Sequence, residues 1–141
     1  MITYKFFKGL PDDAKIIRNT VFVKEQGFAK EFIPGEDDNA ICLVIYFDDK
    51  PIATGRILKE DPETYHIGRV AVLKSYRNQK VGSTVLSFLE TKIKEIGGRK
   101  ATIGSQLDKK EFYEKCGYRV INSHIYYEEN VPHIMMGKFL K

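Results

Sequence analysis

The sequence predicts an α+β (mixed α/β) domain in which one central mixed sheet of about six to seven strands is flanked by helices. Short β-rich runs alternate with amphipathic helical patterns along the whole chain. One run, residues 64–73, is nearly continuously apolar from Ile67 to Leu73, as expected of a strand buried on both faces. No repeat, low-complexity tract or flexible linker interrupts the 141 residues, so we expect a single domain over residues 1–141.

The first half of the chain predicts strands and one helix. Residues 4–8 alternate weakly and predict a first strand. Residues 10–26 begin with a proline and two acids, which favour a first helical turn, and they carry an apolar face. Residues 40–47 and 51–58 are β-rich runs separated by the turn signal DDKP, so they predict a hairpin.

The second half predicts two helices and the remaining strands. Residues 80–98 place an apolar stripe on one helical face and end on Gly97-Gly98, a helix stop. Residues 108–118 predict a short helix with Asp108 as its N-cap and Gly117 as its left-handed terminator. Further strands are expected over residues 100–106, 118–129 and 133–141.

Composition excludes several classes of protein. The chain is 43% hydrophobic and 30% charged, which is too apolar for a disordered protein and too polar for a membrane protein. It has no apolar run near the length of a bilayer span and no signal-peptide pattern, so we expect a cytoplasmic protein without a membrane partner. Cys42 and Cys116 lack a redox spacing, and the three histidines are scattered, so we expect core thiols and no metal.

The charge pattern favours a small anionic ligand. The net charge of +4 is compatible with nucleic-acid binding, but 23 basic residues are mixed with 19 acidic ones outside one basic turn, residues 74–80. We therefore expect no nucleic-acid partner. The acidic cluster Glu36-Asp37-Asp38 is interpreted as a solvated loop.

That basic turn lies within AVLKSYRNQKVGSTV, which predicts a strand, a tight loop and the start of a helix. The first turn of a helix leaves backbone N–H groups unpaired, and the helix dipole makes that end positive. Gly82 removes a side chain where a phosphate would press on the backbone, and Lys74, Arg77 and Lys80 add positive charge. The glycine patterns of ATP-binding and NAD-binding loops are absent, so a different phosphate ligand is indicated.

The same stretch resembles the signature of the GNAT N-acetyltransferases, whose loop pattern is [RQ]-x-x-G-x-[GA]. Arg77 and Gly82 match its two ends, while Lys80 stands where the first glycine is usual. Further along, KKEFYEKCGY is similar to a second element of the family. Its matching residues are Phe112, Tyr113, Gly117 and Tyr118. With VFVKEQ, GRVAV and VPHIMM, these motifs resemble the ElaA/YjcF-like branch.

The resemblance implies a GNAT-type sheet in which strands 67–73 and 100–106 part and open a splayed cofactor cleft for acetyl-CoA. The pantetheine would pair with strand backbone, and the pyrophosphate would rest on loop N–H groups. The implied cofactor-binding residues are Val70, Ala71, Val72, Arg77, Asn78, Gln79, Lys80, Val81, Gly82 and Ser83.

The implied reaction is acetyl transfer to a primary amine of a small molecule by direct attack. A backbone N–H near Val72 would stabilise the developing oxyanion, and Tyr113 would be the general acid toward the departing thiolate. Tyr113 also fits a half-buried packing residue. The central-strand glutamate of many family members is replaced by Gly68, which leaves Glu25, His66 and His133 as candidate bases.

The residues that would bind the acceptor have more than one interpretation. Arg56 and Arg69 fit either contacts to an acidic acceptor or a pair of ion-paired sheet arginines. The expected substrate-binding residues are Glu25, Arg56, Arg69 and His133. Lys80 and Gly68 also suit a non-catalytic acyl-CoA-binding module or regulator. The hydrophobic stretch HIMMGKF would allow a homodimer.

Overall fold

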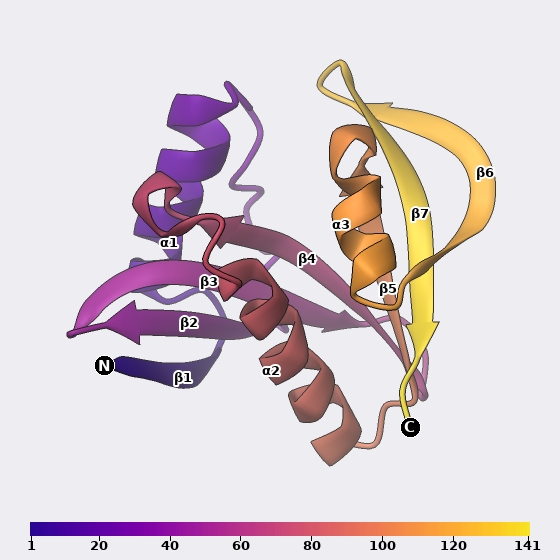
Figure 1. Cartoon of the computed structure of the whole chain (residues 1–141), viewed down its shortest axis with the longest axis horizontal. Helices are drawn as coiled ribbons and strands as arrows, with labels where there is room; N and C mark the ends of the chain where they lie inside the picture. The colour runs from indigo at the N-terminus through magenta and orange to yellow at the C-terminus, as the bar shows by residue number, and fades with distance from the viewer.

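The computed structural model describes all 141 residues and contains one seven-stranded mixed sheet, which confirms the predicted fold class. The strand order is β1-β2-β3-β4-β5-β7-β6, and every neighbouring pair is antiparallel except the parallel pair β4 and β5 (Figure 1). The strands are β1 (Ile2–Lys8), β2 (Ile41–Phe47), β3 (Lys50–Lys59), β4 (Thr64–Val72), β5 (Lys100–Gln106), β6 (Arg119–Glu128) and β7 (Val131–Phe139).

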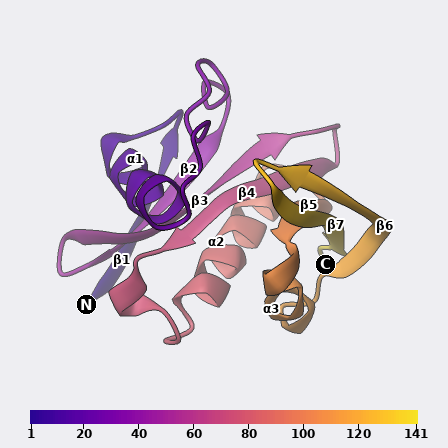
Figure 2. The same cartoon turned by 90° about the horizontal axis from the view of Figure 1, so that it is seen from above.

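Helices cover both faces of the sheet, with α1 on one side and α2 and α3 on the other (Figure 2). The helical segments are α1 (Asp12–Arg18), the π-helix η1 (Asn19–Glu25), the 3₁₀ turn η2 (Lys74–Tyr76), α2 (Val81–Glu95), the 3₁₀ turn η3 (Leu107–Lys109) and α3 (Lys110–Lys115). None of the helices combines the length and the apolar character that crossing a bilayer requires.

Two helix details differ from the sequence-based expectation. The single helix expected over residues 10–26 is α-helical only to Arg18 and then widens into η1. The widened segment contains a threonine and two valines, whose β-branched side chains crowd an α-helical turn. Asp108 does not cap α3, because it lies in the preceding 3₁₀ turn and the N-terminus of α3 carries no side-chain cap.

The core lies on both faces of the sheet, as the alternation along β2 shows. Leu43 and Ile45 join the cluster under α2 and α3, whereas Val44 and Tyr46 join the cluster under α1. Helix α2 contributes four fully buried residues, each of which stabilises the fold by about 2 kcal/mol. These residues are Val85, Leu86, Leu89 and Ile93.

The sheet divides between β4 and β5. The two strands pair only from Thr64 with Lys100 to Ile67 with Ile103. Beyond that point β4 stays paired with β3 through Val72, while β5 stays paired with β7. The two halves of the sheet therefore part in the way that the resemblance implied.

A β-bulge marks the point of division on β4. The pairing of β3 with β4 shifts between Thr54 and Arg56, and Arg69 on the bulged strand has a left-handed φ of 52°. Gly55 lies at this shift, and a Cβ there would come within 2.8 Å of Leu89 Cδ1. Only a glycine lets α2 pack this closely over the bulge.

A buried ion-pair network fixes the loop between η1 and β2, and it corrects the prediction of a solvated acidic cluster. Asp37 is 7% exposed, and its carboxylate lies 3.1 Å from Arg18 Nη1 and 2.7 Å from Arg56 Nη1. Glu36 pairs with Arg56 and Arg69. Burial acts to raise the pKa of Asp37, but hydrogen bonds and charge from Arg56 and Arg18 outweigh it and hold that pKa below its ordinary value.

Asp37→Asn is expected to destabilise the protein by about 3 kcal/mol, because it leaves two buried guanidinium groups short of a charge partner. Asp38→Asn is the matched control. Its side chain is exposed, so the change should stay within about 0.5 kcal/mol. Urea unfolding of both variants measures the difference, and equal midpoints would show that the network does not hold this loop.

Candidate active site

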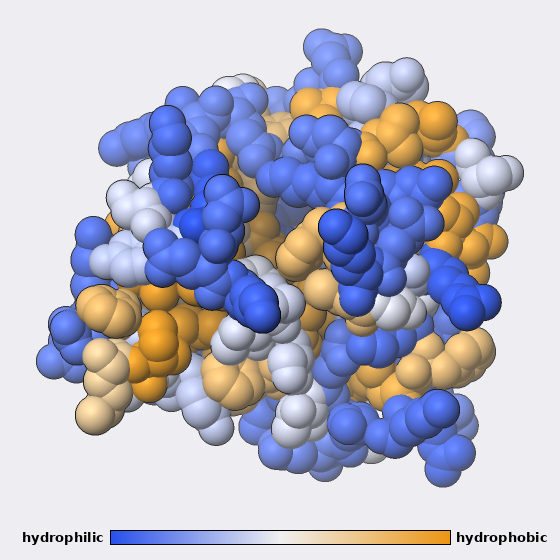
Figure 3. Space-filling view, viewed as in Figure 1, coloured by the Kyte–Doolittle hydropathy of each residue, from blue (hydrophilic) through white to orange (hydrophobic).

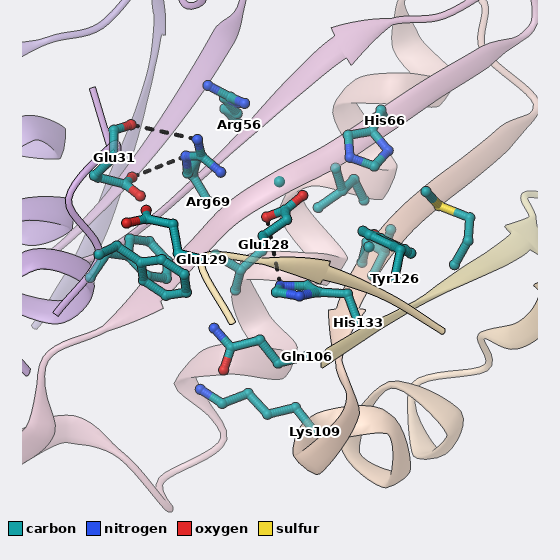
Figure 4. Close-up of a pocket in the computed structure, with 18 of the residues that line it drawn as sticks. Glu31, Arg56, His66, Arg69, Gln106, Lys109, Tyr126, Glu128, Glu129 and His133 are labelled. Carbon is teal, nitrogen blue, oxygen red and sulfur yellow. Dashed lines mark hydrogen bonds and ion pairs between the residues drawn. The ribbon is translucent and has the colours of Figure 1, made fainter. Parts of the chain in front are cut away.

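The division of the sheet opens into a cavity of about 610 Å³. Figure 3 shows a hollow between the two halves of the molecule, and Figure 4 shows polar side chains from both halves lining it. Strand β4 contributes His66, Gly68 and Val70, and β5 contributes Gly104 and Gln106. The opposite wall consists of Tyr126, Glu128, His133 and Met135.

Tyr113 reaches this cavity from α3. It is 9% exposed and lies edge-on to Phe112 and Tyr118, so the aromatic packing fixes its ring. Burial, with a smaller contribution from Cys116, raises the pKa of Tyr113 to about 12. The hydroxyl therefore stays protonated at neutral pH and can act as a donor to an anion formed in the cavity.

The loop before α2 presents free backbone donors. The N–H groups of residues 78–83 donate no hydrogen bond within the chain, and the first bond of α2 runs from Thr84 N to Lys80 O at 3.1 Å. Lys80 has a φ of 64°, which explains why a glycine is usual at this position of the motif. Ser83 and Thr84 use their hydroxyls on the Lys80 carbonyl, each at 2.9 Å. The loop therefore offers an anion its main-chain donors.

Gly82 serves packing in addition to its place in the motif. A Cβ at Gly82 would lie 3.2 Å from Phe112 Cζ, so the missing side chain makes room for the ring from α3. The packing contact with Phe112 adds a second reason for this glycine, and space for a phosphate stays a prediction.

Arg77 turns toward the protein and away from the loop donors. Its Nε donates to Val72 O at 2.9 Å, and its Nη2 donates to Glu25 Oε1 at 3.0 Å. Glu25 is therefore engaged in an ion pair and does not line the cavity, although it was expected to bind substrate. Arg77 thus joins the end of η1 to the end of β4.

The open edge of β4 offers backbone groups to the cleft. Leu73 N donates to Ile52 O at 2.9 Å, so the polar groups of Leu73 face β3. Because these groups alternate along an extended strand, those of Val72 face the cleft and those of Ala71 face β3. Val70, Ala71 and Val72 are thus not equivalent. Val70, one alternation earlier, presents its polar groups to the cleft, whereas Val72 presents its N–H, because its carbonyl already accepts from Arg77.

Two histidines from opposite walls present the same ring nitrogen to the cavity. Thr102 donates its hydroxyl hydrogen to Glu60, so it accepts from His66 Nδ1–H at 2.9 Å. The Nδ1–H of His133 donates to the Val131 carbonyl at 2.8 Å. Each ring, when neutral, therefore has a lone pair on Nε2. Burial lowers the pKa of His66, which favours its neutral form.

Arg56 and Arg69 line the cavity, but they are already paired with carboxylates. Arg56 contacts Glu36 and Asp37, and Arg69 lies 3.0 Å from Glu31 Oε2 and 3.3 Å from Glu36 Oε1 (Figure 4). The structure thus favours the interpretation as ion-paired sheet arginines over that as contacts to an acidic acceptor.

Residues that were not predicted from the sequence join the two halves of the sheet across the cavity. Glu129 accepts hydrogen bonds from the backbone N–H groups of Ala29 at 2.7 Å and Lys30 at 3.1 Å. Gln106 Nε2 donates to Gln26 Oε1 at 2.8 Å. No sequence spacing links these positions, which are far apart in the chain.

The match to a protein-family model decides the family. The model of the acetyltransferase (GNAT) domain matches residues 12–140. The chain belongs to the GNAT acetyltransferase family. This GNAT chain is thus an acyltransferase, and the family resemblance of its motifs is confirmed.

Individual relatives agree with this assignment. The chain is 33% identical over 127 residues to YjcF of Bacillus subtilis, which is named an uncharacterized N-acetyltransferase, covering 89% of this chain and 90% of YjcF. It is 34% identical over 128 residues to ElaA of Escherichia coli, covering 86% of this chain and 82% of ElaA. The crystal structure of ElaA matches with a TM-score of 0.84 over 98% of this chain and 99% of that chain.

A more distant GNAT structure shares the fold with a ligand present. A GNAT family acetyltransferase from Elizabethkingia anophelis, solved with acetyl-CoA bound, matches with a TM-score of 0.76 at 20% identity. The match covers 99% of this chain and 98% of that chain.

Lys80→Gly is expected to preserve or slightly raise stability, because glycine adopts the left-handed conformation that costs other residues about 1 kcal/mol. Lys80→Val should lower stability by about 1 to 2 kcal/mol, because a β-branched residue fits that conformation poorly. Ser87→Gly is the control: in the middle of α2, glycine should destabilise. Thermal unfolding compares the three variants, and a valine variant as stable as the parent would exclude a left-handed Lys80.

Proposed function

We propose that this chain is an acetyl-CoA-dependent N-acetyltransferase that acetylates a primary amine of a small molecule by direct attack. The observations that carry the proposal are the cavity beyond the end of the β4–β5 pairing, lined by Val70 and Tyr113, and the free backbone donors at residues 78–83, which begin the helix that follows β4. A phosphate-bearing thioester needs these features. The family match and the acetyl-CoA complex of the structural relative support the same ligand.

The residues of the cleft fit acetyl-CoA. The N–H groups of residues 78–83 lie at a helix N-terminus, where an anion such as a diphosphate is stabilised, and Lys74 and Lys80 add charge. The cleft-facing groups of Val70 and the N–H of Val72 suit an amide-containing chain by strand addition, while the Val72 carbonyl is held by Arg77. When bound, acetyl-CoA supplies the acetyl thioester. Arg77 and Ala71 were also expected to bind the coenzyme. Because Arg77 is bonded within the chain and the polar groups of Ala71 face β3, these two residues would support coenzyme binding only indirectly.

Tyr113 is proposed as the proton donor to the sulfur of the leaving group. A thiol has an ordinary pKa of about 8.5, so a tyrosine whose pKa burial raises to about 12 remains protonated throughout the useful pH range. Because the pKa of Tyr113 lies above that of the thiol, complete proton transfer from Tyr113 to the thiolate is unfavourable. A hydrogen bond that strengthens as charge develops on sulfur is then the main contribution.

His66 is proposed as the base that takes the proton of the amine. Its Nδ1–H is fixed by Thr102, and Thr102 is held in turn by Glu60, so Nε2 is the free proton acceptor. Gly68 leaves space beside this ring, because even a Cβ there would be 4.0 Å from Nε2. An imidazolium formed by proton transfer would be stabilised by Glu60, whose carboxylate lies 3.4 Å from Nδ1.

Tyr113→Phe is expected to lower kcat by about 100-fold with little change in coenzyme affinity. The control is Tyr127→Phe, because Tyr127 is 67% exposed. Release of free thiol from acetyl-CoA with a panel of primary amines measures turnover, and calorimetry measures coenzyme binding. Binding without turnover for every amine would contradict the transferase and favour a non-catalytic acyl-CoA-binding module.

The pH dependence tests His66. Its pKa is lowered from 6.5 mainly by burial and by Arg56, against the opposing charges of Glu60 and Glu128. Because the neutral ring is the active form, kcat/KM should fall only as the pH drops below about 6.5. His66→Gln should lower kcat/KM and abolish this acid limb, whereas His124→Gln, on an exposed position, should leave it unchanged. An unaltered acid limb in His66→Gln would exclude this base.

A further inference from the structure

We propose that the cavity receives its acceptor as a primary ammonium ion, with Glu128 as the counter-ion and the Nε2 atoms of His66 and His133 as further hydrogen-bond acceptors. This inference rests on the proposed function, because it names the class of acceptor that the same cavity would take. It assigns to Glu128 a binding role that neither the sequence motifs nor the family match supplies.

Glu128 is the carboxylate of the cavity that has neither a lysine or arginine partner nor backbone donors on its oxygens. Its Oε2 lies 3.8 Å from His133 Nε2, and no lysine or arginine pairs with it. Both oxygens of its neighbour Glu129 are occupied by the N–H groups of Ala29 and Lys30. The Glu128 side chain is 55% exposed, so it stays accessible to a ligand.

The charge of Glu128 acts on groups from three strands. It lies beside His133 on β7 and contributes to the pKa values of His66 on β4 and Tyr126 on β6. His133 stacks on Tyr126 with ring centroids 5.5 Å apart, which fixes the imidazole (Figure 4). Figure 4 shows the Glu128 carboxylate between His66 and His133, so a cation held by Glu128 would lie beside His133 and on the side that faces His66.

The hydrogen-bonding character of these groups matches an ammonium ion. A primary ammonium has three N–H donors and no acceptor. A carboxylate and two imidazole Nε2 atoms with lone pairs are acceptors, and each imidazole has its Nδ1–H engaged elsewhere. An alcohol has one donor and no charge, so it would leave two of these three acceptors without a donor and would not balance the carboxylate.

The positive charges of the cavity do not oppose this assignment. Arg56 and Arg69 are balanced by Glu31, Glu36 and Asp37. Lys109 lies beside Gln106, away from His66 (Figure 4). Lys30 is exposed on the loop. Glu128 is thus the carboxylate that is available to a cation beside His133.

The test uses n-butylammonium chloride as the probe and the whole ¹⁵N-labelled protein without coenzyme. The imidazole nitrogen resonances of His66 and His133 should shift saturably, while those of His124, on an exposed position of β6, should not. n-Butanol and equal concentrations of sodium chloride should produce no saturable shift. Glu128→Gln should raise the dissociation constant of n-butylammonium about tenfold, the loss expected for one charge-assisted hydrogen bond.

Glu111→Gln removes an exposed carboxylate on α3 and should leave n-butylammonium binding unchanged. Equal affinity in Glu128→Gln and the parent, equal shifts with n-butanol, or no saturable shift with n-butylammonium would each overturn the proposal. Calorimetry with coenzyme A separates this result from the proposed function. Coenzyme binding without ammonium binding would refute the ammonium site alone, and ammonium binding without coenzyme binding would refute the transferase alone.

Discussion

The parallel pairing of β4 with β5 ends at Ile67 and Ile103, and the whole site depends on that end. Each strand stays paired on its other side, so the two halves of the sheet separate without leaving either strand isolated. The bulge at Arg69 turns β4 away, and α2 packs over the bulge because Gly55 has no side chain. Backbone groups that would have paired with β5 are left for a ligand. The cleft is therefore made by unsatisfied sheet pairing and does not depend on a particular side chain.

The arginines beside the cavity are paired with carboxylates, whereas Glu128 has no lysine or arginine partner. Arg18, Arg56 and Arg69 are matched by Glu31, Glu36 and Asp37, so the network fixes the loop before β2 as one wall of the cavity. Burying such groups is favourable only when each charge has a partner. These three arginines and three carboxylates balance one another. The electrostatic potential inside the cavity therefore depends mainly on the other charged residues that line it.

Cross-cleft contacts determine how the two walls face each other. Glu129 binds the backbone of Ala29 and Lys30, and Gln106 binds Gln26. These hydrogen bonds join segments from the two halves of the sheet, so the walls of the cavity are held together by side chains from the loop after η1, from β5 and from the turn after β6.

The sequence by itself determined the periodic elements, the basic turn before α2 and the family. These depend on local patterns: alternation, helical stripes, glycine stops and a short motif. It did not determine the roles of the charged side chains. The acidic cluster at residues 36–38 was expected to be solvated, yet Asp37 is buried because two arginines from other elements meet it. Glu25 was assigned to substrate but pairs with Arg77, and Glu128 was not singled out. Only the tertiary structure decided these partners, because an ion pair or a lone carboxylate is defined by residues distant in sequence that packing brings within a few ångströms.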